Sequence, residues 1–111
     1  PEGFMREARV QAEQQLGLGA FGAQGLSSLA WAVAVLPAGD DGRALLRGIL
    51  QESAARDELQ PRVVAAVLWA CAKAQVAEGA LFEALGRQLV LRLRDARSRD
   101  LSAAVWAFAT I

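Results

Sequence analysis

Few side chains in this sequence could do chemistry. The chain has no histidine and no tyrosine, and its one cysteine is Cys71. A cysteine nucleophile needs an imidazole or another base beside it, and a zinc site needs several thiolate or imidazole ligands. Neither arrangement can be assembled from these residues. We therefore expect no enzymatic activity, no metal site and no cofactor.

Two other patterns have simpler interpretations than a reactive site. Asp40 and Asp41 could in principle hold a metal ion, but they stand just before an apolar, helix-periodic segment. A carboxylate in that place accepts the free amide hydrogens of a helix start, so we predict a helix cap. Gly17, Gly19 and Gly22 do not make a phosphate-binding loop, because no strand precedes them and no Lys-Ser/Thr pair follows.

Recurring polar residues indicate binding rather than catalysis. The chain has three tryptophans, and seven residues before each one stands a side chain with hydrogen-bond donors. These residues are Gln24, Arg62 and Arg99, ahead of Trp31, Trp69 and Trp106. In helical-repeat proteins that read RNA, a few side chains of each unit contact one base. This row is a candidate RNA-binding set; an ordinary solvated helix start is the alternative.

A second candidate set is a run of arginines near the end of the chain. Arg87, Arg92, Arg94, Arg97 and Arg99 fall close together, with only Asp95 and Asp100 to balance them. They could neutralise phosphates. The alternative is solvated charge, with Glu83 and Arg87 as an i,i+4 ion pair. One continuous basic strip would favour RNA, whereas scattered arginines paired with carboxylates would favour a protein scaffold.

The elements that must position these residues are written three times. The stretches at residues 26–34, 64–72 and 101–109 each contain a tryptophan with alanine one and three positions later, and the tryptophans are 38 and 37 residues apart. Such a period is typical of a helical repeat array. Residues 81–85 repeat residues 45–49 at a spacing of 36, so a second helix recurs as well.

We expect Trp31, Trp69 and Trp106 to form the structural core of the repeats, filling the space between units while the alanines let helices approach closely. Stacking of these rings on RNA bases is the alternative. Cys71 stands at the repeat position of Val33 and Phe108, which predicts a buried small hydrophobic residue.

Apolar periodicity predicts helices at residues 4–16, 23–36, 41–55, 60–74 and 80–93, and one from residue 99 or 100 to the end, with no strand. Residues 17–22 read as a linker, Pro37 as a break, and Pro61 as a first-turn residue. The fold class is therefore all-α: a right-handed α-solenoid of stacked helix–turn–helix repeats with a period of 37–38 residues. Residues 1–22 would be the second helix of a truncated repeat plus a linker, 23–59 repeat 1, 60–97 repeat 2, and 98–111 the first helix of repeat 3.

The tryptophan stretches, with their Leu-x-x-x-x-Trp-Ala-x-Ala pattern, resemble the octotricopeptide-type repeats of algal organelle proteins and the related heptatricopeptide and FAST-kinase-like repeats. Residues 21–32 and 100–110 are similar to the repeat openings of those proteins. The resemblance covers nearly the whole chain, although the proline-rich stretch ending in Trp that is frequent in octotricopeptide units is missing. It implies an array that binds single-stranded RNA in a chloroplast or mitochondrion. It also allows a permanent subunit of a ribosome or another large assembly, in contact with ribosomal RNA or an acidic neighbour.

Composition sets further limits. Twelve basic and 12 acidic residues give a formal net charge of zero, which a stand-alone nucleic-acid-binding domain would not be expected to have. A single cysteine excludes an internal disulfide and indicates a reducing or neutral compartment. No apolar run is long enough to span a bilayer. The chain opens without Met and stops where the third tryptophan stretch finishes, so we expect about three repeats of a longer array, with neighbouring repeats or protein subunits at both ends.

Two functions follow as expectations. The first is an RNA-binding helical-repeat segment of an organellar gene-expression factor that acts in transcript processing, stability or translation. The second is a structural scaffold subunit that makes protein–protein contacts in a large organellar assembly such as a ribosome or photosynthetic complex.

Overall fold

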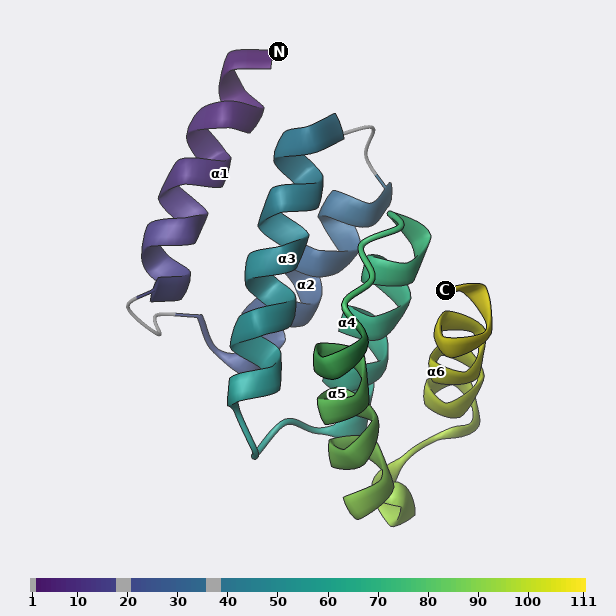
Figure 1. The fold of residues 1–111 in the computed structure, drawn as a ribbon. Helices are drawn as coiled ribbons and strands as arrows, with labels where there is room; N and C mark the ends of the chain where they lie inside the picture. The colour runs from purple at the N-terminus through teal and green to yellow at the C-terminus, as the bar shows by residue number, and fades with distance from the viewer. Residues whose placement is uncertain (1, 18–20, 36–38) are drawn as a thin grey trace.

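The computed structural model describes residues 2–17, 21–35 and 39–111, and within these ranges the chain is helical and contains no strand. The elements are α1 (Glu2–Gly17), α2 (Ala23–Val35), α3 (Gly39–Ala55), α4 (Pro61–Lys73), α5 (Gly79–Leu91), the short 3₁₀ helix η1 (Leu93–Asp95) and α6 (Ser98–Thr110) (Figure 1). The all-α class predicted from the sequence is confirmed. The six α-helices begin and end within two residues of their predicted limits where those limits are described.

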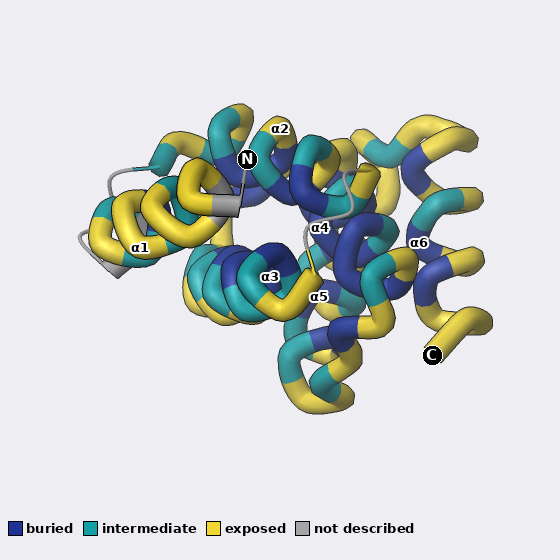
Figure 2. Tube along the Cα trace, turned by 90° about the horizontal axis from the view of Figure 1, so that it is seen from above, coloured by how far each residue is buried: buried dark blue, intermediate teal, exposed yellow. Residues whose placement is uncertain are grey.

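The helices form two layers. The first layer consists of α2, α4 and α6, and in it α4 packs against both neighbours. The second layer consists of α1, α3 and α5, and in it α3 packs against both neighbours. Contacts of α2 with α3, α3 with α4, and α4 with α5 join the layers. The helices follow one another across the molecule from α1 to α6 (Figure 2), which gives principal dimensions of 42 × 28 × 22 Å.

Helix α4 lies at the centre of the core. Its residues Val63, Val64, Val67, Leu68 and Cys71 have no exposed surface, because α4 is covered by helices of both layers. Burying a side chain of the size of valine or leucine contributes about 1.5–3 kcal/mol relative to leaving it exposed. Buried alanines recur along the layer of α4, at Ala30, Ala70 and Ala107. Their small size allows the three helix backbones to lie close together.

The helix starts follow local chemistry. Helix α4 begins at Pro61, as predicted, where the missing proline amide would have had no helical partner. The cap prediction for Asp40 and Asp41 is wrong in its position, since α3 already begins at Gly39 and both carboxylates lie inside its first turn. They still favour the helix there, because acidic groups stabilise a helix N-terminus. The break predicted at Pro37 and residues 18–20 of the predicted linker lie outside the described residues.

Helix α6 starts after the turn η1, whose 3₁₀ geometry the sequence analysis did not predict. The carboxylate of Asp100, the third residue of α6, accepts a hydrogen bond of 3.0 Å from the backbone amide of Arg97. This contact satisfies an amide at the helix start and orients α6 after the turn. It also explains why Asp100, although acidic, is 94% buried, its relative exposure being 6%.

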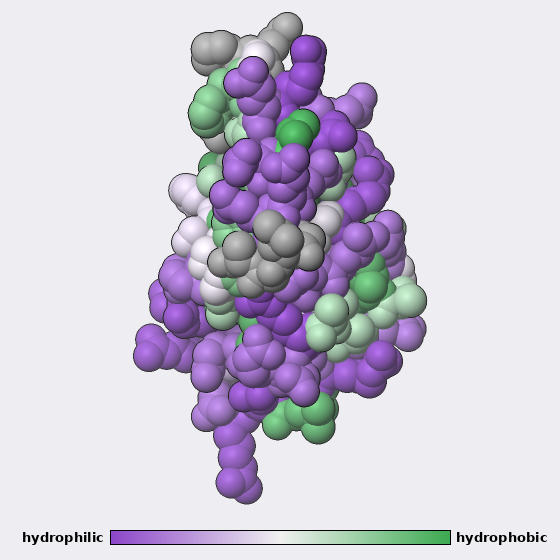
Figure 3. Space-filling view, turned by 90° about the vertical axis from the view of Figure 1, so that its left-hand side faces the viewer, coloured by the Kyte–Doolittle hydropathy of each residue, from purple (hydrophilic) through white to green (hydrophobic). Residues whose placement is uncertain are grey.

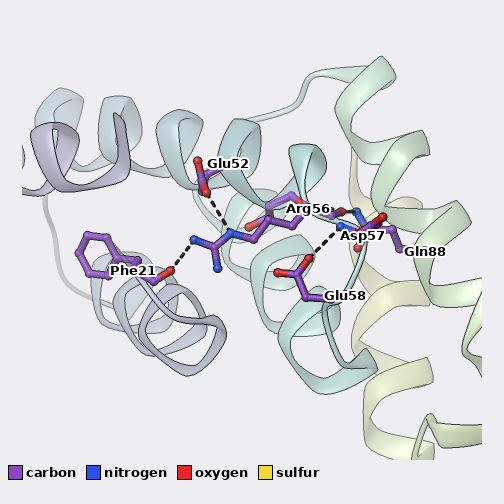
Figure 4. Close-up of polar contacts among 7 residues, drawn as sticks. Phe21, Glu52, Arg56, Asp57, Glu58 and Gln88 are labelled. Atoms are coloured by element: carbon purple, nitrogen blue, oxygen red, sulfur yellow. Dashed lines mark hydrogen bonds and ion pairs between the residues drawn. The ribbon is translucent and has the colours of Figure 1, made fainter. Parts of the chain in front are cut away.

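Polar side chains tie the layers together at one end of α3 and α5 (Figure 4). Arg56 forms an ion pair with Glu52, 2.9 Å between Nε and Oε2, and donates a second hydrogen bond to the carbonyl of Phe21, ahead of α2. Thirty-six residues later, Arg92 donates to the carbonyl of Asp57, ahead of α4, at 2.8 Å. Two arginines at matching positions therefore hold the second-layer helices to the loops that precede first-layer helices.

Candidate nucleic-acid interface

The tryptophans lie at the surface rather than in the core. Trp31 is 57% exposed and Trp106 is 44% exposed. Trp69, on the central helix α4, is partly buried. The prediction that they form the core of the repeats is therefore wrong for Trp31 and Trp106.

Helix geometry gives the reason for this position. Successive residues of an α-helix are about 100° apart, so positions separated by two lie on nearly opposite faces. Trp69 is two residues from both Val67 and Cys71, which are fully buried. The tryptophan therefore projects away from the second layer, onto the outer face of α4. The same spacing separates Trp31 from the buried Val33.

The aromatic rings form a partly accessible cluster. The ring centroids of Trp69 and Trp106 are 6.5 Å apart, with their planes tilted by 39°. The ammonium group of Lys73 lies 5.7 Å from the centroid of Trp69, within the range of a cation–π contact. Flat π-surfaces beside a cation on an accessible face are the chemistry that single-stranded nucleic acids bind.

A shallow groove lies beside Trp69, between that ring and Trp31. Its volume is about 280 Å³. Its lining comes from all three helices of the first layer: Trp31 from α2; Arg62, Ala65, Ala66 and Trp69 from α4; and Arg99, Asp100 and Ala103 from α6. We call it the tryptophan groove. The alanines keep its floor low, so the aromatic rings and arginines stand as its walls.

The predicted row of Gln24, Arg62 and Arg99 is brought to this groove. Each is the second residue of its helix, in α2, α4 and α6 respectively. Arg62 donates a hydrogen bond to the side-chain carbonyl of Gln24, and the Gln24 amide lies 3.2 Å from the Ser28 hydroxyl. Arg62 and Arg99 line the groove, and Gln24 adjoins it through Arg62. All three side chains are exposed.

The predicted arginine run does not form one strip. Arg87 lies on α5, Arg94 in η1 and Arg97 directly before α6, and only Arg99 reaches the tryptophan groove. Arg92 is engaged by the carbonyl of Asp57, which assigns it a structural contact. The ion pair considered between Glu83 and Arg87 is not among those that the described part of the chain forms. The turn η1 and the change of layer at α6 separate residues that are close in sequence.

Charge is divided between the layers although the chain is neutral. Helices α2, α4 and α6 carry only Arg62, Lys73, Arg99 and Asp100, and this one acid is buried against its own helix start. Acidic residues outnumber basic ones in α1, α3 and α5, which hold Glu2, Glu7, Glu13, Asp40, Asp41, Glu52 and Glu83 against Arg6, Arg9, Arg43, Arg47 and Arg87. The first layer is thus the basic side of the molecule.

Lys73 is a candidate binding residue that the sequence analysis missed. A signal was present, because Lys73 follows Trp69 by four residues and such pairs face each other on a helix. It was not used because the tryptophan was expected in the core, where a neighbouring lysine would have had no accessible ring to approach.

The structure gives no support to reactive chemistry at Cys71. The side chain is fully buried, with its Sγ atom 3.8 Å from the Leu46 carbonyl oxygen. Burial raises the pKa of the thiol from 9.0 to about 12, and the nearby Glu78 charge adds to the rise. A thiol with this pKa is protonated at neutral pH, and the thiolate is the reactive form. The predicted buried position of Cys71 is confirmed.

Metal sites and membrane-spanning helices are also lacking among the described residues. The residues that the structure describes contain no cluster of three or more His, Cys, Asp or Glu side chains that could hold a metal ion. Asp41 is instead paired with Arg9 of α1, 2.6 Å between Oδ1 and Nη1. Among the helices described, none combines the length and the apolar character needed to cross a membrane.

Comparisons with known proteins do not assign the chain to a family. No family model matches the sequence, and no curated protein or solved structure matches it. The function must therefore be argued from the surface itself.

Proposed function

We propose that this chain binds single-stranded RNA along the tryptophan groove. The observation that carries the proposal is the gathering, on one layer, of accessible tryptophan rings and of cationic groups that form no ion pair with the residues described. The rings of Trp31, Trp69 and Trp106 stand on the same three helices as Arg62, Lys73 and Arg99. Stacking of a base on an aromatic side chain is worth about 1–3 kcal/mol, and it tolerates any base because every base has a π-face.

Cations complete the proposed mode of binding. Arg62 and Arg99 flank the groove at the start of their helices, and Lys73 lies beside the ring of Trp69. Together they would contact the phosphates of a strand whose bases lie on the rings. The Gln24 amide and the guanidinium groups would also offer hydrogen bonds to base edges or sugar hydroxyls, as RNA-binding repeats do.

The proposal extends to the architecture and the cellular setting. The two-layer order of the helices and the matching contacts of Arg56 and Arg92 support an α-solenoid of helix–turn–helix repeats. Together with the resemblance of the tryptophan stretches to octotricopeptide-type repeats, this leads us to place the protein among RNA-binding factors of chloroplast or mitochondrial gene expression.

A salt titration tests the proposal. We would measure the fluorescence anisotropy of a labelled single-stranded RNA with the 1–111 chain between 50 and 300 mM salt. Three phosphate contacts, by Arg62, Lys73 and Arg99, predict a slope of about −2 in log affinity against log salt, because each contact to a single strand contributes about −0.7. Arg62→Ala or Arg99→Ala should lower the affinity and make the slope about 0.7 less steep.

The matched control is Arg47→Ala, an exposed arginine on α3 in the other layer. It should change neither the affinity nor the slope. Absence of binding at 50 mM salt by a folded protein, or an equal effect of Arg47→Ala and Arg62→Ala, would reject the tryptophan groove as the RNA site.

A scaffold role in an organellar assembly is the second candidate. What favours it is a separate apolar surface between α5 and α6, which is suited to a protein rather than to a nucleic acid. The two roles are compatible because the two surfaces lie on different elements. A protein that binds a helical partner but shows no salt-dependent affinity for RNA would act as a scaffold alone.

A further inference from the structure

Helices α5 and α6 enclose an apolar groove, which we call the α5–α6 groove. Its volume is about 770 Å³, and its walls include Leu89, Val90 and Leu93 on one side and Leu101, Val105 and Phe108 on the other. Val90 and Val105 are 67% and 68% exposed. So many accessible apolar side chains in one hollow mark an interaction surface rather than the ordinary scatter of single residues.

The matching positions of α4 show what such a surface looks like when it is covered. Thirty-seven residues before Leu101, Ala104, Val105 and Phe108 stand Val64, Val67, Leu68 and Cys71. All four have no exposed surface, whereas Leu101, Val105 and Phe108 are 38%, 68% and 41% exposed. Helix α4 packs against both α3 and α5, while the extensive contacts of α6 within the described chain are with α4. The α6 surface therefore lacks the counterpart that α5 provides for α4.

The helices that cover α4 share a pattern. Both begin with a leucine, at Leu45 and at Leu81. Counted from that leucine, Leu or Phe stands one residue later, Ile or Leu four residues later, Glu or Gln seven residues later and Arg eleven residues later. The members are Leu45, Leu46, Ile49, Glu52 and Arg56 in and just after α3, and Leu81, Phe82, Leu85, Gln88 and Arg92 in and just after α5. The two arginines donate to loop carbonyls, and Gln88 donates to carbonyls at the end of α3, whereas Glu52 pairs with Arg56.

Polar contacts at the end of α3 have a matching acceptor at the end of α5. The Ser53 carbonyl accepts from the backbone amide of Arg56 and also from the Gln88 side chain, at 3.2 Å each. Thirty-six residues later, the Leu89 carbonyl accepts from the backbone amide of Arg92 at 3.1 Å. Leu89 lines the α5–α6 groove. Its carbonyl is placed to accept a hydrogen bond from a glutamine side chain of an incoming helix, as the Ser53 carbonyl accepts from Gln88.

The base of the groove is already shaped for close helix packing. Phe108 meets Phe82 edge to face, with ring centroids 5.6 Å apart and planes at 82°. A Cβ atom at Gly86 would lie 3.1 Å from the Phe108 ring, so glycine at this position allows the ring to rest on α5. Contacts with Phe82 and Gly86 therefore hold the Phe108 ring in place at the base of the α5–α6 groove.

We propose that the α5–α6 groove binds one amphipathic helix of a partner polypeptide, carrying the pattern Leu-Leu/Phe-x-x-Ile/Leu-x-x-Gln-x-x-x-Arg. The incoming helix lies against α5 and α6 as α5 lies against α3 and α4. Its apolar residues cover Val105 and Leu101, and its glutamine donates a hydrogen bond to the Leu89 carbonyl.

A second copy of this chain does not fit the groove by the same packing. The helix that would have to enter is α1, at the opposite end of the second layer. Its exposed face carries Arg6, Glu7, Gln11 and Gln14, with Val10 and Phe4 as the exposed apolar residues. Figure 3 shows the face of the molecule on that side, which is largely hydrophilic. Burying such a surface against an apolar groove would leave polar groups unpaired, which is unfavourable.

A peptide with the sequence of residues 39–57 and the change Glu52→Gln, which gives it the full pattern, is a direct probe. We would label it with fluorescein and titrate it with the 1–111 chain, following fluorescence anisotropy. We expect saturable binding, and a gain of helical circular dichroism when the unlabelled peptide is mixed with the protein. The same peptide with Ile49→Glu should bind at least tenfold more weakly.

Two protein variants locate the site. Val105→Glu places a charge in the groove at an exposed position, so the fold is kept, and it should weaken peptide binding at least tenfold. Val10→Glu is the matched control, an exposed helical valine on α1, and should change the affinity less than twofold. Val105→Glu should leave RNA binding unchanged, which separates this inference from the proposed function.

Three results would overturn the inference. The first is no saturable peptide binding by the folded wild-type chain. The second is equal binding by wild type and Val105→Glu, which would mean that the peptide exchanges with α3 or binds elsewhere. The third is self-association of the wild-type chain, measured by light scattering, that Val105→Glu abolishes, since the occupant would then be a second copy.

Discussion

At the scale of single residues, the outward position of the tryptophans determines what the first layer can bind. Each ring follows from its spacing to the buried residues two positions away, as Trp69 does from Val67 and Cys71. An indole on an outer face leaves apolar area open to water, and several such rings on one face mark a candidate interaction surface. The exposed rings and the neighbouring ammonium group of Lys73 together indicate where a ligand would bind.

Angular position on the helix explains both the correct prediction for Cys71 and the wrong one for the tryptophans. Cys71 was placed correctly because its repeat equivalents are apolar and its face is continuous with Val64 and Leu68. The tryptophans were placed wrongly because residue size was given more weight than angular position. The periodicity of the buried residues contained the right answer, since two residues of separation turn a side chain to the other face of the helix.

Cys71 gives a pH-dependent prediction. Its folded-state pKa of about 12 lies above the ordinary value of 9.0. The contribution of the protonated thiol to the free energy of unfolding is therefore fully present below pH 9 and is lost as the pH rises toward 12. Between these values the unfolded chain releases the proton and the folded chain keeps it. The free energy of unfolding should therefore fall by about 1.4 kcal/mol per pH unit from this group.

Urea denaturation at pH 8, 9, 10 and 11 measures this slope. Cys71→Val, which installs the residue found at the equivalent position Val33, should show a shallower decline above pH 9. Parallel curves for the two proteins, or rapid reaction of the native thiol with a disulfide reagent at pH 8, would contradict the buried, protonated thiol.

At the scale of elements, the helices were largely predictable and their contacts were not. Apolar periodicity and residues such as Pro61 locate helices because the signals are local. The sequence predicts a turn between the helices at residues 80–93 and 99 onward but not the 3₁₀ geometry of η1, because no proline or glycine before Arg97 marks it. The contact of Arg92 with the Asp57 carbonyl joins positions 35 residues apart, and only the packed helices bring them together.

Arg56 shows how much such a contact contributes to the stability of an element. Its side chain is only 15% exposed and binds both Glu52 and the Phe21 carbonyl. Arg56→Ala should lower the free energy of unfolding by about 1–3 kcal/mol, because it removes a charge-assisted hydrogen bond and leaves a partly buried carboxylate without its partner. Arg47→Ala, which changes an exposed arginine of α3, should stay within about 0.5 kcal/mol of wild type. Equal urea midpoints for the two variants would show that the Arg56 contacts do not hold α3 in place.

At the scale of the whole molecule, two layers convert a neutral sequence into a polarised surface. The basic residues of α2, α4 and α6 face no exposed acid on their own helices, while the acids gather on the other layer. Total charge could not indicate this, because the formal net charge is zero. A net charge of zero therefore does not exclude nucleic-acid binding by the first layer, whose helices carry three basic residues and one buried acid.

The candidate site was predictable only in part for the same reason. Gln24, Arg62 and Arg99 were found because they recur at one position before each tryptophan, and the structure brings Arg62 to Gln24. The arginine run at residues 87–97 looked equally basic in sequence, but it is divided between α5, η1 and the start of α6. Which charges share a face depends on the layer of each helix, and that is a property of the packed molecule.

The most direct test of the central claim is the intrinsic fluorescence of the 1–111 chain during titration with single-stranded RNA. All three tryptophans belong to the first layer, two of them well exposed, so no tryptophan elsewhere adds an unresponsive background. If bases stack on the rings, emission should be quenched in a saturable way, with the same dissociation constant as anisotropy gives, and quenching by iodide should decrease in the complex. RNA that binds without changing the emission or the iodide accessibility would contradict a tryptophan groove that holds the bases.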